Sequence, residues 1–334
     1  MNESTVDIHI DRSLIQTEEE MLARWGHLDE PLVSIVCTAY NHEPFIADAI
    51  DGFLIQQTDF PFEILIHDDA SKDRTAEIIE KYEKRYSNII KPVYQKENQY
   101  SKGKKIFFSE IKRATGRYIA VCEGDDYWID PLKLSKQVRF LEKNPEYVIT
   151  GHDAVVVDVE GKIIKESKLP DFHKKDFDSD DLIKVRAWIL TMSWVFRNVL
   201  LDMPPEMHLV KNGDTFMTSL LGWYGKSKYM SEIQPAVYRV HAGGVWSLIG
   251  AKEQLESQLY TYLMLYKYYK RIGKKEYASF FRNFFMIKSF QMMNLVFILK
   301  RFASRFFFLS AIKSRIGRIV RMLQNKFCHV EQNF

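Results

Sequence analysis

The chain has 334 residues, 46% hydrophobic and 14% aromatic, which is enough for one large domain or two modest ones with sizeable cores. The three cysteines, Cys37, Cys122 and Cys328, fit no zinc or redox spacing, and two lie in apolar runs, so we expect reduced, buried thiols in a cytoplasmic protein. We expect neither a signal peptide nor a membrane span, because no uncharged apolar run reaches about 18 residues.

The net charge of +3 conceals a division of charge along the chain. From Ala251 to the end there are 16 Lys and Arg residues against 4 Asp and Glu, which leaves 31 against 40 in the rest. An acidic body is therefore followed by a basic tail.

The first elements can be read from apolar runs and their boundaries. Residues 1–30 are polar and are predicted to form an N-terminal extension. The β-branched run at 32–38 predicts a buried strand, and Asn41 is the expected N-cap of a helix that continues to about Gln57. A second strand is expected at 62–67, before a helix capped by Ser71 or Asp73.

Strands and helices continue to alternate after this point. We predict strands at 89–94, 118–122, 147–157, 188–196 and 229–240, helices at 106–114, 132–143 and 215–223, and a loop at 162–180. Such alternation predicts a parallel or mixed α/β sheet flanked by helices. Right-handed crossovers place the carboxyl ends of parallel strands at one edge, where ligands bind.

Carboxylates follow two of these predicted strands. Asp68 and Asp69 end the second strand, and Glu123, Asp125 and Asp126 follow the strand at 118–122. Adjacent carboxylates repel, so the pairs indicate either a solvated acidic loop or a site for Mg²⁺ or Mn²⁺. Because the chain has neither GxGxxG nor GxxxxGK[ST], a phosphate ligand would have to be held through a metal.

Two further residues are candidates on position alone. Asp214 lies at the N-terminus of a predicted helix, where it is either a cap or a functional carboxylate. His241 follows a predicted strand and precedes a glycine loop, so it is either a structural histidine or a metal ligand.

Residues 251–334 are predicted to be helical, with aromatic side chains interleaved with Lys and Arg. These helices either pack on the body or lie at an anionic membrane interface, and the basic charge favours the interface. RNA is a weaker alternative because no RNA-binding signature accompanies the charge, so we expect no nucleic-acid partner.

Three motifs resemble those of family 2 glycosyltransferases, in the same order. They are VSIVCTAYN at 33–41, EILIHDDASKDRT at 63–75 and GRYIAVCEGDDYWIDPLKL at 116–134. NGD at 212–214 resembles the family's ED motif with Gly in place of Glu, and YRVHAGGVWS at 238–247 resembles a terminal block common in bacterial members. The resemblance implies a GT-A fold and an inverting, nucleotide-sugar-dependent transferase of the bacterial surface-polysaccharide type.

The same resemblance implies individual roles for residues of these motifs. Tyr40 would stack on the nucleotide base beside Thr38, Asp69 would accept from a base N–H that suits uracil, and Asp125 would contact the ribose or sugar. Asp126 would bind the divalent cation, Mn²⁺ or Mg²⁺, and Asp214 would be the general base. His241 is expected as an additional metal or diphosphate ligand. Because sugars stack on indoles, Trp128 and Trp246 are candidate acceptor contacts, whereas Trp194 is expected in the core.

The chain is thus expected to have four parts. These are the extension 1–30, a nucleotide-sugar-binding half at 31–130, an acceptor-binding half at 131–250 and the helical region 251–334. The expected partners are a nucleotide-sugar donor, a glycan or lipid-linked acceptor and an anionic membrane surface, which would place the protein at the inner face of the cell membrane. The alternatives are a nucleotidyltransferase, which would need a glycine-rich first loop, and a receiver-like phosphoacceptor module built on Asp68 and Asp69.

Overall fold

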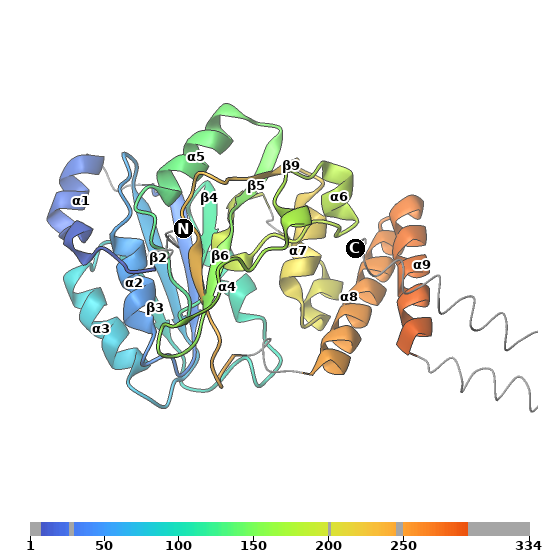
Figure 1. Ribbon diagram of the computed structural model, residues 1–334, viewed down its shortest axis with the longest axis horizontal. Coiled ribbons are helices and arrows are strands. Elements are labelled where there is room, and N and C mark those ends of the chain that lie inside the picture. Colours follow the sequence, from blue (N-terminus) through green and yellow to red (C-terminus); the bar gives the residue numbers. More distant parts are fainter. Residues whose placement is uncertain (1–7, 27–29, 200–201, 245–249, 293–334) are drawn as a thin grey trace, which may run out of the picture. The chain divides into compact units, whose positions relative to one another are not determined.

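The computed structural model describes residues 8–26, 30–199, 202–244 and 250–292 (Figure 1). By its contacts the chain divides into one compact unit, residues 1–281, and a second, residues 282–334. The described helices and strands belong to the first unit, except that helix α9, Lys275–Met292, continues into the second.

A seven-stranded sheet organises the first unit. In spatial order its strands are β3 (Ile90–Tyr94), β2 (Phe62–Asp68), β1 (Val33–Ala39), β4 (Tyr118–Val121), β8 (Val195–Arg197), β5 (Tyr147–Gly151) and β9 (Lys226–Tyr229). Only β8 is antiparallel to its neighbours. The sheet is therefore mixed and mainly parallel, as predicted, and six strands have their carboxyl ends at one edge.

Helices cover both faces of this sheet, so its apolar strands are buried on both sides. One face packs against α1 (Glu18–Trp25), α2 (Ile46–Leu54), α3 (Thr75–Arg85) and α5 (Lys133–Lys143). The other packs against α4 (Ile106–Arg113), α6 (Ser179–Ile183), α7 (Gly213–Leu221) and α8 (Ala251–Arg271). Helix α1 belongs to this core through Met21, although the polar composition of residues 1–30 predicted an extension.

A small second sheet consists of β10 (Ala236–Arg239), β6 (Ala154–Val157) and β7 (Ile163–Lys165). It is joined to the loop after β4 by paired backbone hydrogen bonds between Tyr127 and Val237, at 3.2 and 2.9 Å. This bridge places the segment after β10 beside residues 123–126, which we call the acidic loop.

Helix α8 packs as core. Leu265 and Tyr269 are fully buried, and the Tyr269 hydroxyl lies 2.7 Å from the Ser219 hydroxyl of α7. Of the two interpretations of the C-terminal region, core packing therefore holds for α8, and residues 293–334 lie outside the described residues. No helix in the described ranges combines the length and the apolar character needed to cross a membrane.

The expected cap of α2 was wrong. The helix begins at Ile46, not after Asn41, because Asn41 is engaged in bonds between loops. Its backbone N–H donates to the Ser71 hydroxyl at 2.9 Å, and its side-chain oxygen accepts from the Lys72 N–H at 2.8 Å. Its φ of 54° is the left-handed conformation that Asn tolerates better than most residues.

Some predicted boundaries also differ from the structure. The strand expected at 147–157 breaks at His152 and Asp153 into β5 and β6, which join different sheets. The strand expected at 188–196 is reduced to β8, and the loop expected at 162–180 contains β7 and the start of α6. Cys37 and Cys122 are buried and unpaired, whereas Cys328 lies outside the described residues.

Candidate active site

The ends of β1, β2 and β4 meet at the carboxyl edge of the large sheet, and backbone bonds hold them together. The Asp69 N–H donates to the Ala39 carbonyl at 2.9 Å, and the Gly124 N–H donates to the Thr38 carbonyl at 3.0 Å. A Cβ on Gly124 would lie 2.8 Å from Ile46 Cδ1 and 3.0 Å from His42 Nδ1, so the loop at 123–126 lies close against α2 and the end of β1. The apolar strands thus place three polar loops side by side.

Asp125 lies beside two histidines from distant parts of the chain. Its Oδ2 is 2.9 Å from His241 Nε2 and 3.8 Å from His42 Nε2. The three side chains each offer one ligand atom, and these atoms lie within 4.8 Å of one another. Burial alone would raise the pKa of Asp125, but the hydrogen bond from His241 and the nearby His42 lower it below its ordinary value. The group is therefore ready to bind a cation as a carboxylate.

Asp126 is buried next to this cluster. Its Oδ1 accepts the backbone N–H of Arg239 at 2.9 Å. Burial, followed by the charges of Asp125 and Glu123, raises the pKa of Asp126 well above its ordinary value. Carboxylates crowded in this way are stabilised by a bound cation.

Glu123, the first residue of the acidic loop, interacts electrostatically with Asp214. Burial, then the charge of Asp125, raises the pKa of Glu123 to about 7, and the charge of Asp214 adds to this rise. Asp214 is the second residue of α7, and burial raises its pKa too. The structure thus brings Asp214 into the electrostatic field of the acidic loop.

Asp69 is buried and already holds a loop. Its Oδ1 accepts the Gln99 N–H at 2.7 Å, and its Oδ2 accepts the Tyr100 N–H at 3.0 Å. His67 lies beneath it, with Nε2 at 3.9 Å from Asp69 Oδ1 and Nδ1 at 2.8 Å from Glu110 Oε1. Tyr40 directly follows β1, and it is 38% exposed.

Residues 34–201 match the model of the family described as glycosyl transferase family 2. The chain belongs to this family. As a family 2 member it has the GT-A fold, and the alternatives of a nucleotidyltransferase or a receiver-like module are set aside.

Relatives whose names describe glycosyltransferases agree with this assignment. The chain is 38% identical over 217 residues to an uncharacterised protein of Mycobacterium bovis, with 64% of this chain and 60% of that protein covered. It is 34% identical over 131 residues to the putative teichuronic acid biosynthesis glycosyltransferase TuaG of Bacillus subtilis, covering 39% of this chain and 50% of TuaG. It is also 39% identical over 112 residues to the Escherichia coli UDP-Glc:alpha-D-GlcNAc-diphosphoundecaprenol beta-1,3-glucosyltransferase WfaP, covering 33% and 41%. The chain thus spans 60% or less of the length of these relatives.

Two solved structures share the fold of this family 2 chain. S. aureus TarS in complex with UDP-GlcNAc has a TM-score of 0.51 at 19% identity, covering 70% of this chain and 66% of TarS. The mannosyltransferase PcManGT of Pyrobaculum calidifontis, in complex with GDP-Man and Mn²⁺, has a TM-score of 0.51 at 14% identity, covering 93% and 86%.

Trp128, one of the two tryptophans expected at the acceptor site, lies in the core of this family 2 structure. Trp128 is 1% exposed, donates from Nε1 to the Met192 carbonyl at 2.7 Å, and has Lys133 Nζ 3.8 Å from its ring centroid. It therefore packs beneath the acidic loop and presents no face to an acceptor. Trp194 is buried, as expected, and Trp246 lies outside the described residues.

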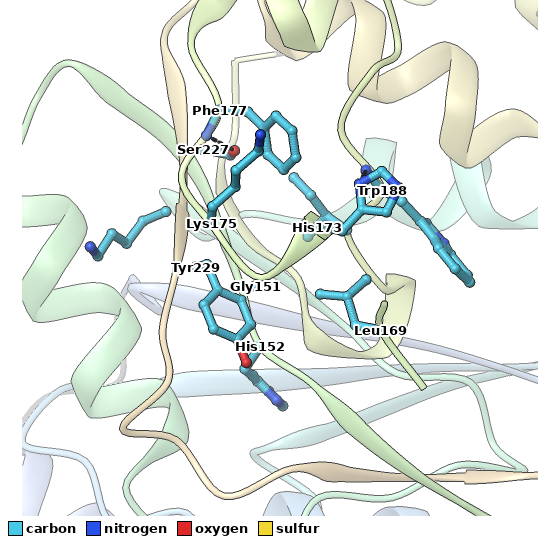
Figure 2. A pocket seen from close by; sticks show the side chains of 11 residues that line it. Gly151, His152, Leu169, His173, Lys175, Phe177, Trp188, Ser227 and Tyr229 are labelled. Carbon is cyan, nitrogen blue, oxygen red and sulfur yellow. Dashed lines mark hydrogen bonds between the residues drawn. The ribbon is translucent and has the colours of Figure 1, made fainter. Parts of the chain in front are cut away.

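An aromatic pocket that the sequence did not indicate lies at the carboxyl ends of β5 and β9. Figure 2 shows the rings of His173 and Trp188 next to each other on one side of it and Tyr229 on the other. Trp188 is 42% exposed, and its ring meets that of His173 edge-on at 6.0 Å between centroids. Because β5 and β9 end at the same edge as β1 and β4, this pocket lies on the edge of the sheet that also carries the loop at 123–126.

One residue of the site was missed, and another was named without a role. His42 directly follows the first motif, in the loop after β1, and that position was the available signal. Glu123 was named among the carboxylates after the predicted strand at 118–122, but its spacing gave it no role separate from Asp125 and Asp126.

Proposed function

We propose that the protein is an inverting glycosyltransferase of cell-surface polysaccharide or lipopolysaccharide biosynthesis. It transfers a sugar from a nucleoside diphosphate sugar, in our proposal UDP-linked, to a hydroxyl group of a glycan or a lipid-linked acceptor. The observation that carries the proposal is the meeting of Asp125, His42 and His241 at the strand ends, with Asp214 in the field of the same loop. The UDP-Glc donor named for WfaP and the UDP-GlcNAc bound to TarS support UDP, and the names of TuaG and WfaP support a polysaccharide acceptor.

The donor would be bound between the ends of β1, β2 and β4. Tyr40 offers an exposed ring for stacking the base, and Thr38 lies two residues before it, near the end of β1. Each carboxylate oxygen of Asp69 already accepts one backbone N–H and has capacity for a second donor, so a uracil N–H can still be accepted. Asp125 would contact the ribose or the sugar as well as a cation.

A divalent cation fits the residues present. Asp125, His42 and His241 would hold it together with Asp126, whose Oδ1 already accepts a backbone N–H. Two imidazoles in the set favour Mn²⁺ over Mg²⁺, because Mg²⁺ prefers oxygen ligands. When bound, the cation supplies positive charge for the leaving nucleoside diphosphate.

Asp214 would act as the general base. Burial raises its pKa, which makes its carboxylate a stronger proton acceptor than that of an ordinary aspartate. It would take the proton of the acceptor hydroxyl as that oxygen attacks the anomeric carbon opposite the leaving group. A single displacement of this kind inverts the configuration. Glu123 would take the place of the missing glutamate of the ED motif as the acidic neighbour of Asp214.

We also propose that the basic C-terminal region contacts an anionic membrane surface at the cytoplasmic face. Within the described part of α9, Met286, Ile287 and Phe290 are about half exposed. Exposed apolar side chains on a helix in a basic region suit the interface of anionic lipids.

The donor is tested with a panel of nucleotide sugars incubated with the full-length protein and Mn²⁺. We expect one UDP-sugar to be hydrolysed or transferred, and NMR of the released sugar or product to show inverted anomeric configuration. Retention of configuration would contradict the displacement, and turnover of none of the panel would contradict the proposed activity.

A further inference from the structure

A basic cavity lies beside the candidate active site and takes no part in the chemistry described so far. Its volume is about 330 Å³, and three lysines and a histidine line it: Lys104, Lys105, Lys112 and His208. The remaining lining residues are Gly103, Phe108 and Ser109, so no carboxylate contributes to the wall. A cavity of this size falls in the range of small-molecule sites.

Within the described ranges, the lysines of this cavity lack a carboxylate at ion-pair distance, although the charge of Lys104 reaches Glu97. Among the described residues, Lys104, Lys105 and Lys112 make no ion pair with a carboxylate, whereas nearby Lys102 pairs with Glu97 and Arg113 with Glu110. Burial, and then the charge of Lys211, lowers the pKa of Lys105, although Lys211 is itself paired with Glu253 at 2.9 Å. Lysines that lack an ion-pair partner of their own are stabilised by a bound anion.

The N-terminus of α4 adds to this preference. Lys105 is the N-cap residue, no side chain caps the helix, and its first turn contains no acidic residue. The free N–H groups of a helix N-terminus and its dipole favour an anion, most often a phosphate.

The cavity adjoins two parts of the candidate site, the start of α7 that carries Asp214 and the loop that Asp69 binds. Phe108, one of its walls, lies against Gly213, where a Cβ would come within 2.8 Å of the Phe108 ring, and Gly213 precedes Asp214. The loop that enters the cavity is held by Asp69 through the N–H groups of Gln99 and Tyr100. An anion bound here would therefore sit next to the chain that carries the proposed base.

We propose that this cavity binds a phosphate or diphosphate group, and that this group belongs to the acceptor. The second part rests on the proposed function, since it requires an acceptor that carries a phosphate, such as a lipid-linked sugar diphosphate. Lysine ammonium groups and helix N–H groups would bind the phosphate oxygens, and the acceptor hydroxyl would extend from there toward Asp214.

The anion site is tested with inorganic pyrophosphate and the full-length protein in EDTA, so that no metal contributes. By calorimetry we expect binding that weakens about tenfold in Lys112→Ala, because one charge-assisted contact is lost. Lys112→Arg should restore most of it, and Lys81→Ala on α3, at an exposed lysine of the opposite face, should bind like the wild type. Failure of the wild type to bind, or unchanged binding by Lys112→Ala, would overturn the site.

The source of the phosphate is tested with the same variant. We expect Lys112→Ala to raise the KM for a diphosphate-linked acceptor about tenfold, with little change in kcat, in the KM for an unphosphorylated glycan, or in Mn²⁺-dependent UDP binding. If Lys112→Ala instead weakened UDP binding and left the acceptor KM unchanged, the bound phosphate would belong to the donor, and the proposal would be overturned. Pyrophosphate binding does not depend on transfer, so loss of the proposed activity with retained pyrophosphate binding would count against the proposed function alone.

Discussion

The Nε2 atom of His241 lies 2.9 Å from Oδ2 of Asp125, although the two residues are 116 positions apart. Asp125 follows the central strand β4, whereas His241 follows β10 of the small sheet. The bridge between Tyr127 and Val237 holds these two segments in register. The small sheet therefore positions His241 at the carboxyl edge of the large sheet.

Replacing His241 should weaken the metal site more than the fold. We expect His241→Ala to lower the affinity for Mn²⁺ in the presence of UDP by about tenfold or more, because a ligand is lost and Asp125 loses its hydrogen bond. Titration of Mn²⁺ followed by electron paramagnetic resonance measures this. UDP binding in EDTA is the control and should not change. Equal Mn²⁺ affinity in the variant and the wild type would remove His241 from the site.

Lys133 should make stability depend on pH. Its Nζ is buried over Trp128, and burial lowers its pKa from 10.5 to about 7. Between these values the unfolded chain binds one more proton than the folded chain, so this lysine makes stability rise with pH from about 7 to about 10. Lys133→Met should lack this rise and be more stable at pH 7 by roughly 2–4 kcal/mol. Urea denaturation at several pH values tests this, and parallel pH profiles of the two proteins would contradict it.

Gly52 should be necessary for the packing of α2 under the acidic loop. A Cβ at this position would lie 2.8 Å from the Trp128 carbonyl oxygen and 2.9 Å from its nitrogen, and both are backbone atoms with little freedom to move. We expect Gly52→Ala to destabilise the protein by about 1–3 kcal/mol. Gly250→Ala, where nothing lies within 4 Å of the new Cβ, should cost less than about 1 kcal/mol. Thermal unfolding of both variants compares them, and equal losses would show that the contact with Trp128 yields easily.

The membrane proposal predicts a role for the exposed apolar residues of α9. We expect the double variant Ile287→Ser and Phe290→Ser to bind vesicles containing phosphatidylglycerol several-fold more weakly than the wild type. Val159→Ser is the matched control, since Val159, Ile287 and Phe290 are each 54% exposed. Sedimentation with vesicles measures binding, and equal binding by the double variant and the wild type would contradict the role of α9. Truncation before α8 would be a poor test, because it removes buried core residues such as Leu265.

Sequence patterns predicted the architecture well where the signal is local. The apolar runs that became β1, β2 and β4 are buried on both faces, and such runs are recognisable without tertiary information. The polar segments that end them could be placed at one edge because parallel strands leave no other arrangement. For this reason the sequence alone predicted that Asp69 and Asp125 lie on the same side of the molecule.

The predictions that proved wrong failed because tertiary contacts override local sequence patterns. Asn41 has the residue type of a helix cap, but its hydrogen bonds go to the loop at Ser71 and Lys72, and no local rule ranks that alternative. The break at His152 and Asp153 occurs because Asp153 bonds the N–H groups of Ala154 and Leu169 and so turns the chain to the small sheet. Trp128 is of a residue type that stacks on sugars. The sequence does not reveal that Lys133 and the core cover the faces of its ring, because this depends on tertiary packing.

The contrast between Asp214 and Asp126 tests the central claim most directly. With the donor identified from the nucleotide-sugar panel, transfer rates and Mn²⁺-dependent UDP binding should be measured for Asp214→Asn and Asp126→Asn. We expect Asp214→Asn to lose roughly 10²–10⁴-fold in transfer while binding UDP like the wild type, and Asp126→Asn to lose both. Transfer by Asp214→Asn at the wild-type rate would contradict the account.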